Sequence, residues 1–530
     1  MNNLYVFAIC GSGERVMKSL VMMLASGVPI GAKRLIPVFV DNDTQSQALT
    51  SCLELISYYN SNPQKNKTGN VGLHFLCKSS GLNTTASFAH ADISEPILLN
   101  VAGNQIGTLD SIIGQLNTKD PVQDSLDEEK NLLFTKDDLD MPLNVGFVGN
   151  PNIGSVVLNS LSLNSPDFQS IYQGVGNNDG VFVIGSLFGG TGAAGFPLII
   201  NKFKALPQNA CPLLGGVAVL PYFNVSTAKS SSEQPPINTQ KYNVDSGTFS
   251  SKTRAALMYY DEYMRNMDYM YYVGDNKFRS TYPSSVGGTG QKNPYNIIEL
   301  MAAESVLNFS FADTSNKPDN VVYKMPVGDF SGTDGTIANV SSIRNKELRK
   351  ALVKFQMMKY MFESHDFLKW GIDQNHEYVE DIKFSQKILG AVNDGKCLNN
   401  YSQAWCLRTF FDAWNLWMSD LGDAKQVKRQ LVISSNDAKG VTRDNISGKF
   451  YADNKNGIAK TETHKEGGFL GFGGKEVIVP KSPEIEDAML QAYRSLKINK
   501  ATASESTALS MLMVIISKAL DHVLANNCDL

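Results

Sequence analysis

The first half of the chain alternates short apolar runs with longer amphipathic stretches. Because the apolar runs are nearly continuous, they predict strands buried on both faces, as in a parallel sheet. The amphipathic stretches at 14–24 and 45–59 predict helices that cross between strands. The pattern therefore predicts an α/β fold with a doubly wound, mostly parallel sheet. The runs that predict strands are 4–9, 35–40, 72–77, 181–184, 215–220 and 269–273.

The second half of the chain has a different pattern, in which helical periodicity places Met, Phe and Trp on one face. This predicts a mainly helical C-terminal region. The predicted helices are 346–370, 401–421, 484–496 and 504–526. Two segments fit neither pattern: the glycine-rich 445–479 predicts a loop or hairpin, and the polar 79–141 predicts an insertion or long surface loop.

Composition excludes several classes of protein. The chain has 530 residues, 42% of them hydrophobic, which is ample for burial and excludes a disordered protein. With 48 Lys and Arg against 52 Asp and Glu, the net charge of −4 lacks the basic surplus of a nucleic-acid-binding protein. No stretch reaches the roughly 18 apolar residues that a membrane helix needs. The start of the chain lacks the basic flank of a signal peptide.

Cysteine and histidine usage indicates the compartment. The 7 cysteines form no CxxC pair, and the 6 histidines are scattered without ligand spacing. This predicts reduced thiols in the cytoplasm, with neither a disulfide framework nor a zinc site. We assign no metal ligands from the sequence.

Four loops adjoin predicted strands where each can approach a phosphate group. Glycine lets backbone N–H groups come close to an anion, and a following helix presents the positive end of its dipole. The first loop contains Gly11, Ser12 and Gly13 and begins like the dinucleotide fingerprint GxGxxG, although Val16 stands where the third glycine belongs. A tight strand-to-helix turn is the alternative interpretation.

The second and third loops are less specific. The second places Asp43 and Gln45 after the second predicted strand. A carboxylate there suits a ribose hydroxyl or a metal-bound water beside phosphates, whereas a plain helix N-cap uses the same residue types. The third loop contains Gly149 and Asn150 before a proline, and a simple turn would serve equally well.

The fourth loop is the most specific of the four. Glycines surround one threonine and small residues follow, which gives a nest of amide groups with a hydroxyl available to phosphate. No ordinary turn needs so many small residues. The chain contains no GKS or GKT, so this loop is not a Walker A motif. Its residues are Gly189, Gly190, Thr191, Gly192 and Ala193.

The order of these loops resembles that of the tubulin/FtsZ family of GTPases. Residues 189–192 are similar to the family's GGGTGS/TG motif, and the other three loops are similar to its first phosphate loop, its NTDxQ loop and its GANP loop. The strand at 269–273 ends in Gly-Asp-Asn, similar to the family's loop whose asparagine, here Asn276, contacts the nucleoside. Tyr295 and Glu299 open a helix that looks like the family's central helix.

That helix would select the base. An aromatic residue and an acid four positions apart lie on the same helix face. Tyr295 can then stack on a purine, while Glu299 accepts hydrogen bonds from guanine N1–H and N2–H₂, which adenine cannot offer. This arrangement selects GTP over ATP. The alternative is a solvated glutamate beside a packed tyrosine.

The resemblance implies a cytoplasmic protein that binds GTP and Mg²⁺, assembles head to tail and hydrolyses GTP at the contact between copies. In the family an acidic loop after the central helix enters the next subunit's site, and the candidates here are Asp313 and Asp319. The resemblance covers 1–312, a GTP-binding domain with an insertion near 79–141. The mainly helical domain at 313–530 then becomes a candidate for binding a protein partner.

Several positions depart from the family pattern. Phe188 replaces the first glycine of the fourth loop, Glu14 and Arg15 replace the usual asparagine of the first, and no NxDxxD pattern is present. Two other functions therefore stay open. One is a nucleotide-gated binding or scaffold protein without polymerisation or turnover. The other is a Rossmann-type redox enzyme that uses the first loop and Asp41.

Overall fold

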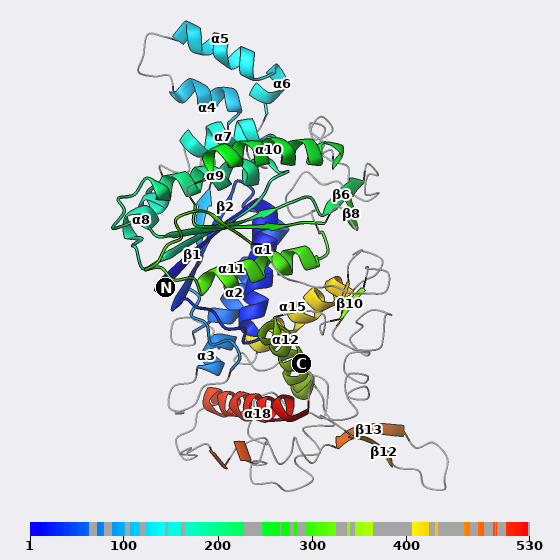
Figure 1. Ribbon diagram of the computed structural model, residues 1–530. Helices are drawn as coiled ribbons and strands as arrows, with labels where there is room; N and C mark the ends of the chain where they lie inside the picture. The colour runs from blue at the N-terminus through cyan, green and yellow to red at the C-terminus, as the bar shows by residue number, and fades with distance from the viewer. Residues whose placement is uncertain are drawn as a thin grey trace. The chain divides into compact units, whose positions relative to one another are not determined.

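A computed structural model describes most of the chain, and Figure 1 shows the arrangement of its elements. The described residues are 1–62, 71–78, 87–100, 107–116, 123–141, 143, 147, 149–160, 165–226, 246–265, 267–275, 280–283, 292–324, 337–339, 345–363, 405–422, 430–432, 460–466, 475–481, 491–492, 494–495 and 505–527, apart from side chains at some helix and strand positions.

The described residues form one large sheet of seven strands, in the order β3-β2-β1-β4-β5-β7-β9. Every neighbouring pair in it is parallel. The five inner strands are apolar and mostly buried because helices cover both faces, whereas the edge strands β3 and β9 are partly exposed. The predicted α/β class and five of the six predicted strands are confirmed. The strands are β1 (Asn3–Ile9), β2 (Arg34–Asp41), β3 (Ile97–Asn100), β4 (Gly180–Ser186), β5 (Leu213–Val219), β7 (Tyr269–Val273) and β9 (Val322–Lys324).

Helices lie on both faces of this sheet (Figure 1). On one face, α11 (Ile297–Ser310) contacts β4, β5 and β7. On the other, α9 (Gly190–Lys204) contacts β1, β4 and β5. Helices α7 (Pro151–Ser160) and α10 (Phe249–Tyr263) pack on α9. Two further helices follow the first two strands: α1 (Cys10–Ala25) and α2 (Gln47–Asn60).

The segment predicted as a third strand, 72–77, is helical instead. It forms α3 (Leu73–Cys77), whose buried residues Leu73, Leu76 and Cys77 follow helical spacing. A short apolar run fits either element, and here the i, i+3, i+4 pattern prevails. The third strand is β3, which lies within the segment expected to be a loop or insertion. That segment also holds α4 (Leu109–Leu116), α5 (Gln123–Leu133) and α6 (Lys136–Leu139), so its described part is not a long loop.

The helical character of the C-terminal half is confirmed by α12 (Lys346–Glu363), α15 (Trp405–Gly422) and α18 (Glu505–Asn527). The predicted helix at 484–496 lies mostly outside the described residues. The predicted hairpin is present as the antiparallel pair β12 (Lys460–Glu466) and β13 (Lys475–Lys481). Two short parallel pairs lie outside the large sheet: β6 (Phe223–Ser226) with β8 (Ser280–Pro283), and β10 (Ile337–Asn339) with β11 (Gln430–Val432). Helix α8 (Pro166–Gly174) precedes β4, and a 3-10 helix (Ser246–Thr248) precedes α10.

The chain divides into two compact units. The first comprises 1–20, 30–54 and 93–326, and the second comprises 21–29, 55–92 and 327–530. The domain boundary after residue 312 stays a prediction. In the second unit, Phe355 packs on Trp414 with ring centroids 4.5 Å apart, and Trp414 and Trp417 are fully buried. These aromatic residues of α15 therefore form core. Among the described residues, no helix is both long and apolar enough to cross a membrane.

Candidate functional site

The topology of the large sheet singles out one crevice. From the central pair β1 and β4, the chain adds β2 and β3 on one side and β5, β7 and β9 on the other. In an open parallel sheet, ligands bind outside the carboxyl ends of the strands where the order reverses in this way. The segments that follow β1, β2 and β4 meet at this edge, and they contain three of the four predicted loops.

The first loop is the first turn of a helix. Strand β1 ends at Ile9 and α1 begins at Cys10, whose φ of 56° lies in the left-handed region. Gly11 to Gly13 are therefore helical, and the expectation of a separate loop is wrong. A Cβ on Gly13 would lie 2.7 Å from the backbone carbon of Ala8, so this glycine lets the helix start close to the strand. Gly11 has nothing within 4 Å of such a position and faces open space.

The fourth loop leads directly into α9. Gly189 is the N-cap residue and offers no side chain to the first amide groups of the helix. A Cβ on Gly192 would lie 2.8 Å from Ser186 N and O, so the turn closes tightly on the end of β4. Thr191 is buried and hydrogen-bonded to the Cys10 thiol. The first and fourth loops therefore lie side by side.

The third loop packs against the fourth. A Cβ on Gly190 would lie 2.9 Å from Asn150 N. Gly149 has a φ of 74°, which favours glycine, and Lys252 Nζ lies 3.2 Å from where its Cβ would be. Lys252 is on α10, a hundred positions later, and sequence spacing gave no signal for it. Asn150 Nδ2 donates a hydrogen bond to Asp138 Oδ1 at 3.2 Å.

The second loop brings carboxyl groups to this edge. Asp43 N donates to Asp41 Oδ1 at 3.0 Å, and Gln45 N donates to Asp43 Oδ1 at 3.1 Å. Asp43 is buried and Gln45 is exposed. Asp41 also shares a hydrogen bond with the carboxyl group of Glu14. The second loop therefore joins the first through two acids.

The Glu14 carboxyl group is fully buried. Its Oε2 accepts a hydrogen bond from Ser46 Oγ at 2.9 Å, beside the hydrogen bond that the carboxyl group shares with Asp41. Burial, followed by the charge of Asp41, raises the pKa of Glu14 well above its usual range, and burial also raises the pKa of Asp41. A proton shared between the two acids relieves their repulsion. The charge that Glu14 would oppose to a phosphate is thereby reduced.

Arg15 does not point toward the glycine turns. Its Nε donates to Glu299 Oε1 at 2.6 Å, and its Nη1 donates to Asn293 O at 2.7 Å. The guanidinium carbon lies 5.2 Å from the centroid of the Tyr295 ring. Glu299 also accepts from Tyr222 Oη at 2.8 Å and caps α11 through Asn296 N at 3.0 Å. Tyr295 and Glu299 both contact Arg15, but Tyr295 precedes the N-cap residue Asn296 and lies outside α11, so the expected placement of the two side chains on one helix face is wrong. Glu299 is buried and paired.

The predicted acidic residues lie at the opposite edge. The loop after α11 is held by Lys317 Nζ, which donates to Cys211 O and Pro212 O just before β5 begins. Asp313 and Asp319 are exposed on it. Hydrogen bonds from the Ser315 hydroxyl and amide lower the pKa of Asp313. Asn276 lies outside the described residues, and within the described part no cluster of three or more His, Cys, Asp or Glu side chains forms a metal site.

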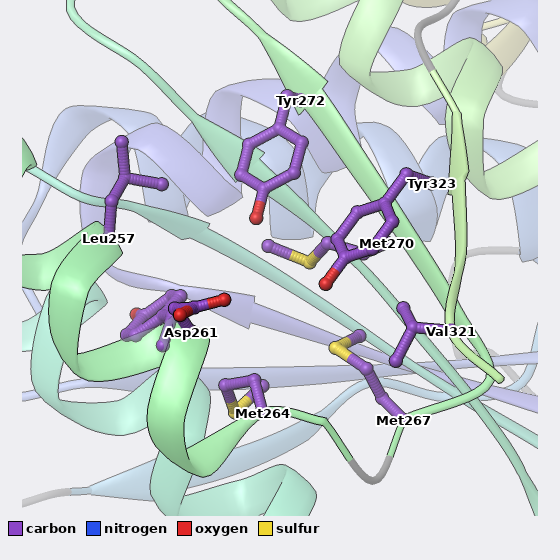
Figure 2. A pocket seen from close by; sticks show the side chains of 9 residues that line it. Leu257, Asp261, Met264, Met267, Met270, Tyr272, Val321 and Tyr323 are labelled. Carbon is purple, nitrogen blue, oxygen red and sulfur yellow. The ribbon is translucent and has the colours of Figure 1, made fainter.

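Phe188, where the sequence pattern departs from glycine, has a structural role. Its ring packs on Phe249 and Phe223, with centroids 4.7 Å and 5.5 Å apart. A cavity of about 250 Å³ lies elsewhere in the first unit, beside the amino end of β7 (Figure 2). Its lining combines Met264, Met267 and Met270 with Asp261 and three tyrosines. It is separate from the glycine turns.

Comparisons with known proteins give a distant likeness to solved structures. No family model and no curated protein sequence matches this chain. Among solved structures, the chain is similar to CetZ2 from Haloferax volcanii, described as a GTPgS-bound protofilament, with 13% sequence identity and a TM-score of 0.27. The match covers 59% of this chain and 59% of that one. The α/β fold of the chain follows from its own sheet topology, and any function has to follow from its own residues.

Proposed function

We propose that this chain binds GTP at the carboxyl edge of its large sheet, assembles head to tail, and hydrolyses GTP at the contact between copies. The observation that carries the proposal is the convergence of four loop segments at the topological switch point. The turns after β1 and β4, the Gly149 turn and the acidic turn after β2 all meet there. Three of these segments offer backbone amides and small residues, which suit a polyphosphate, and the acidic turn lies beside them.

The phosphate groups would lie on the turns of Gly11, Ser12 and Gly13, of Gly149 and Asn150, and of Gly189 to Ala193. Gly11 faces open space, and the N-terminus of α9 has no side-chain cap, so both can turn amide groups to an anion. Lys252, beside Gly149, supplies a cation. Mg²⁺ would enter as part of the nucleotide complex, held mainly by phosphate oxygens and water, near Asp43 and Gln45.

The base would lie at the start of α11. Tyr295 offers a ring face and Glu299 a carboxylate, a pair that suits the two N–H groups of guanine and not adenine. Asn276, which follows β7, is proposed to contact the nucleoside. This arrangement makes GTP the preferred nucleotide.

Hydrolysis is assigned to Asp313 and Asp319 of a second copy. Helix α11 runs from the carboxyl edge to the amino edge of the sheet and has 14 residues, so it is about 21 Å long. One chain therefore cannot bring its own acidic loop to its own glycine turns. A head-to-tail contact can, since it places the amino edge of one copy against the carboxyl edge of the next. A carboxylate at this contact would orient the attacking water. Repeated head-to-tail contacts would build a filament, which we place in the cytoplasm.

The test is GTP turnover in Mg²⁺ measured against protein concentration, with light scattering recorded in the same cuvette. Turnover per molecule that rises steeply above a threshold, together with scattering, supports a site completed between copies. Asp313→Asn and Asp319→Asn should lower turnover while GTP binding persists. Turnover per molecule that is independent of concentration contradicts the shared site.

Two alternatives have specific support. Asp313 is already hydrogen-bonded to Ser315, which favours a nucleotide-gated scaffold that binds a protein partner and does not turn over; tight GTP binding with negligible hydrolysis would identify it. The strand order 3-2-1-4-5 and Asp41 at the end of β2 also occur in Rossmann-type redox enzymes. Binding of NAD in preference to GTP would identify that class.

A further inference from the structure

We infer that Arg15 is an internal substitute for the guanine base: its guanidinium occupies the position between Tyr295 and Glu299, and GTP must displace it. This inference rests on the proposed function, because it concerns the base end of the same site. It makes Arg15 a residue that sets the affinity and specificity of the site for the base.

The guanidinium group and guanine share the chemistry that this position recognises. Both are planar, and both carry N–H groups that a carboxylate accepts. Arg15 donates its Nε–H to Glu299 Oε1 at 2.6 Å, and its guanidinium carbon lies 5.2 Å from the centre of the Tyr295 ring. Guanine would offer N1–H and N2–H₂ to the same carboxylate and its π face to the same ring. Adenine has no matching pair of donors.

The other hydrogen bonds to Glu299 are not ones that a base can replace. Oε1 also accepts from the Tyr222 hydroxyl, and Oε2 accepts from Asn296 N in the capping box of α11. Both of those contacts belong to the fold itself. The Arg15 contact is therefore the one that an incoming base can replace.

The exposed fractions of the two side chains also indicate that Arg15 has to move first. The Arg15 side chain is 12% exposed, whereas the Glu299 side chain is 0% exposed. Arg15 is thus the more accessible side chain of the pair, and in the proposed site a base reaches Glu299 only after the guanidinium has moved. Two backbone carbonyls, Asn293 O and Pro294 O, also accept hydrogen bonds from Arg15 and hold it in place. The affinity for guanine is reduced by the population of this closed state.

The experiment uses nucleosides, which carry no phosphate. Binding of guanosine and adenosine to the full-length wild type and to Arg15→Ala is measured by equilibrium dialysis, with melting temperature as a second readout. We expect Arg15→Ala to bind guanosine at least about tenfold more tightly than wild type does, with adenosine unchanged. Equal binding of guanosine and adenosine by a folded Arg15→Ala protein overturns the inference.

Lys18→Ala is the matched control. Lys18 Nζ lies 4.8 Å from the centre of the same Tyr295 ring, so the variant removes the other nearby cation and keeps the Arg15–Glu299 pair. We expect it to gain no guanosine binding. An equal gain in Lys18→Ala and Arg15→Ala means that loosening of α1, and not vacating the carboxylate, admits the base, and it overturns the inference.

Removing Arg15 leaves a buried carboxylate, so the variant could fail to fold. In that case it is refolded with guanosine, with adenosine, or with guanidinium far below denaturing concentrations. Recovery with guanosine and guanidinium, but not with adenosine, supports the inference. Recovery of the folded protein with none of the three additives, or with all three alike, overturns the inference.

The two proposals fail separately. Suppose that inorganic triphosphate competes with GTP on wild type while Arg15→Ala gains nothing for guanosine. The phosphate site then stands and the role of Arg15 is wrong. If Arg15→Ala binds guanosine while neither protein binds triphosphate, the role of Arg15 stands and the glycine turns are not a phosphate site.

Discussion

Arg15 Nε and Glu299 Oε1 lie 2.6 Å apart and join helix α1 to the start of α11 across 284 positions of the sequence. The carboxylate is fully buried, and the guanidinium nearly so. Breaking such a pair on one side strands a buried charge, which costs more than the intact pair contributes. The pair therefore fixes the geometry of the proposed base site, and its stability can be measured without any ligand.

We predict that Glu299→Ala lowers the free energy of unfolding by about 3 kcal/mol, because it leaves the Arg15 guanidinium without its carboxylate. Urea unfolding followed by far-UV circular dichroism measures this. In a double-mutant cycle, Arg15→Met with Glu299→Met should be much less destabilising than the sum of the single changes. Additive effects would show that the two side chains are not coupled.

The two glycines of the β1–α1 turn should respond differently to alanine. At Gly13 the new Cβ would lie 2.7 Å from the Ala8 backbone, so Gly13→Ala should destabilise by about 1–3 kcal/mol through overpacking. At Gly11 the new Cβ meets nothing within 4 Å, so Gly11→Ala should leave stability nearly unchanged. Thermal unfolding of both variants makes the comparison. Equal losses would contradict the described turn.

Glu14 predicts a pH dependence of stability. Its pKa is raised in the folded chain from the usual 4.5, mainly by burial, so the folded state binds a proton that the unfolded state has already lost. The stability that the protonated Glu14 contributes is fully present below the usual pKa. It is lost as the pH rises toward the raised pKa of the folded chain. The side chain in Glu14→Gln is always neutral. The free energy of unfolding of this variant should therefore rise relative to that of wild type as the pH rises, by up to about 1.4 kcal/mol per pH unit.

Urea unfolding of both proteins from pH 5 upward measures this difference. Glu54→Gln, which removes an exposed carboxylate from α2, is the control and should show no such growing advantage. A constant difference between wild type and Glu14→Gln across the range would mean that Glu14 is ionised in the folded chain.

Lys252 should contribute to phosphate binding because its ammonium group lies beside the Gly149 turn. Lys252→Gln should weaken binding of inorganic triphosphate by about tenfold, the effect of losing one charge-assisted contact. Lys204→Gln, which removes an exposed lysine from the far end of α9, is the matched control. Fluorescence competition against a labelled GTP gives both affinities. Equal effects would indicate a general loss of positive charge.

The sequence predicted those parts of the fold whose pattern had one interpretation. Near-continuous apolar runs such as 181–184 could only be buried strands. The run at 72–77 was ambiguous, because a short run with four apolar side chains fits a strand or a short helix. Strand β3 escaped prediction since its four residues lie within a polar segment. Short elements depend on tertiary contacts that the local pattern does not encode.

Some residues of the candidate site were evident from the sequence, and others were not. The glycine turns carry a composition that ordinary turns do not need, so they stood out. Lys252 had no motif around it, and only the packing of α10 against the Gly149 turn brings it near. The pairing of Arg15 with Glu299 was equally hidden, because residues so far apart in sequence are joined by the topology of the sheet.

The most direct test of the central claim is equilibrium binding of GTP to the full-length wild type in Mg²⁺ by isothermal titration calorimetry. Inorganic triphosphate serves as competitor, and ATP and NAD as comparison ligands. The account predicts one GTP per chain, displaced by triphosphate, with weaker binding of ATP and none of NAD. Saturable binding of NAD without GTP, or no binding of any triphosphate, would contradict it.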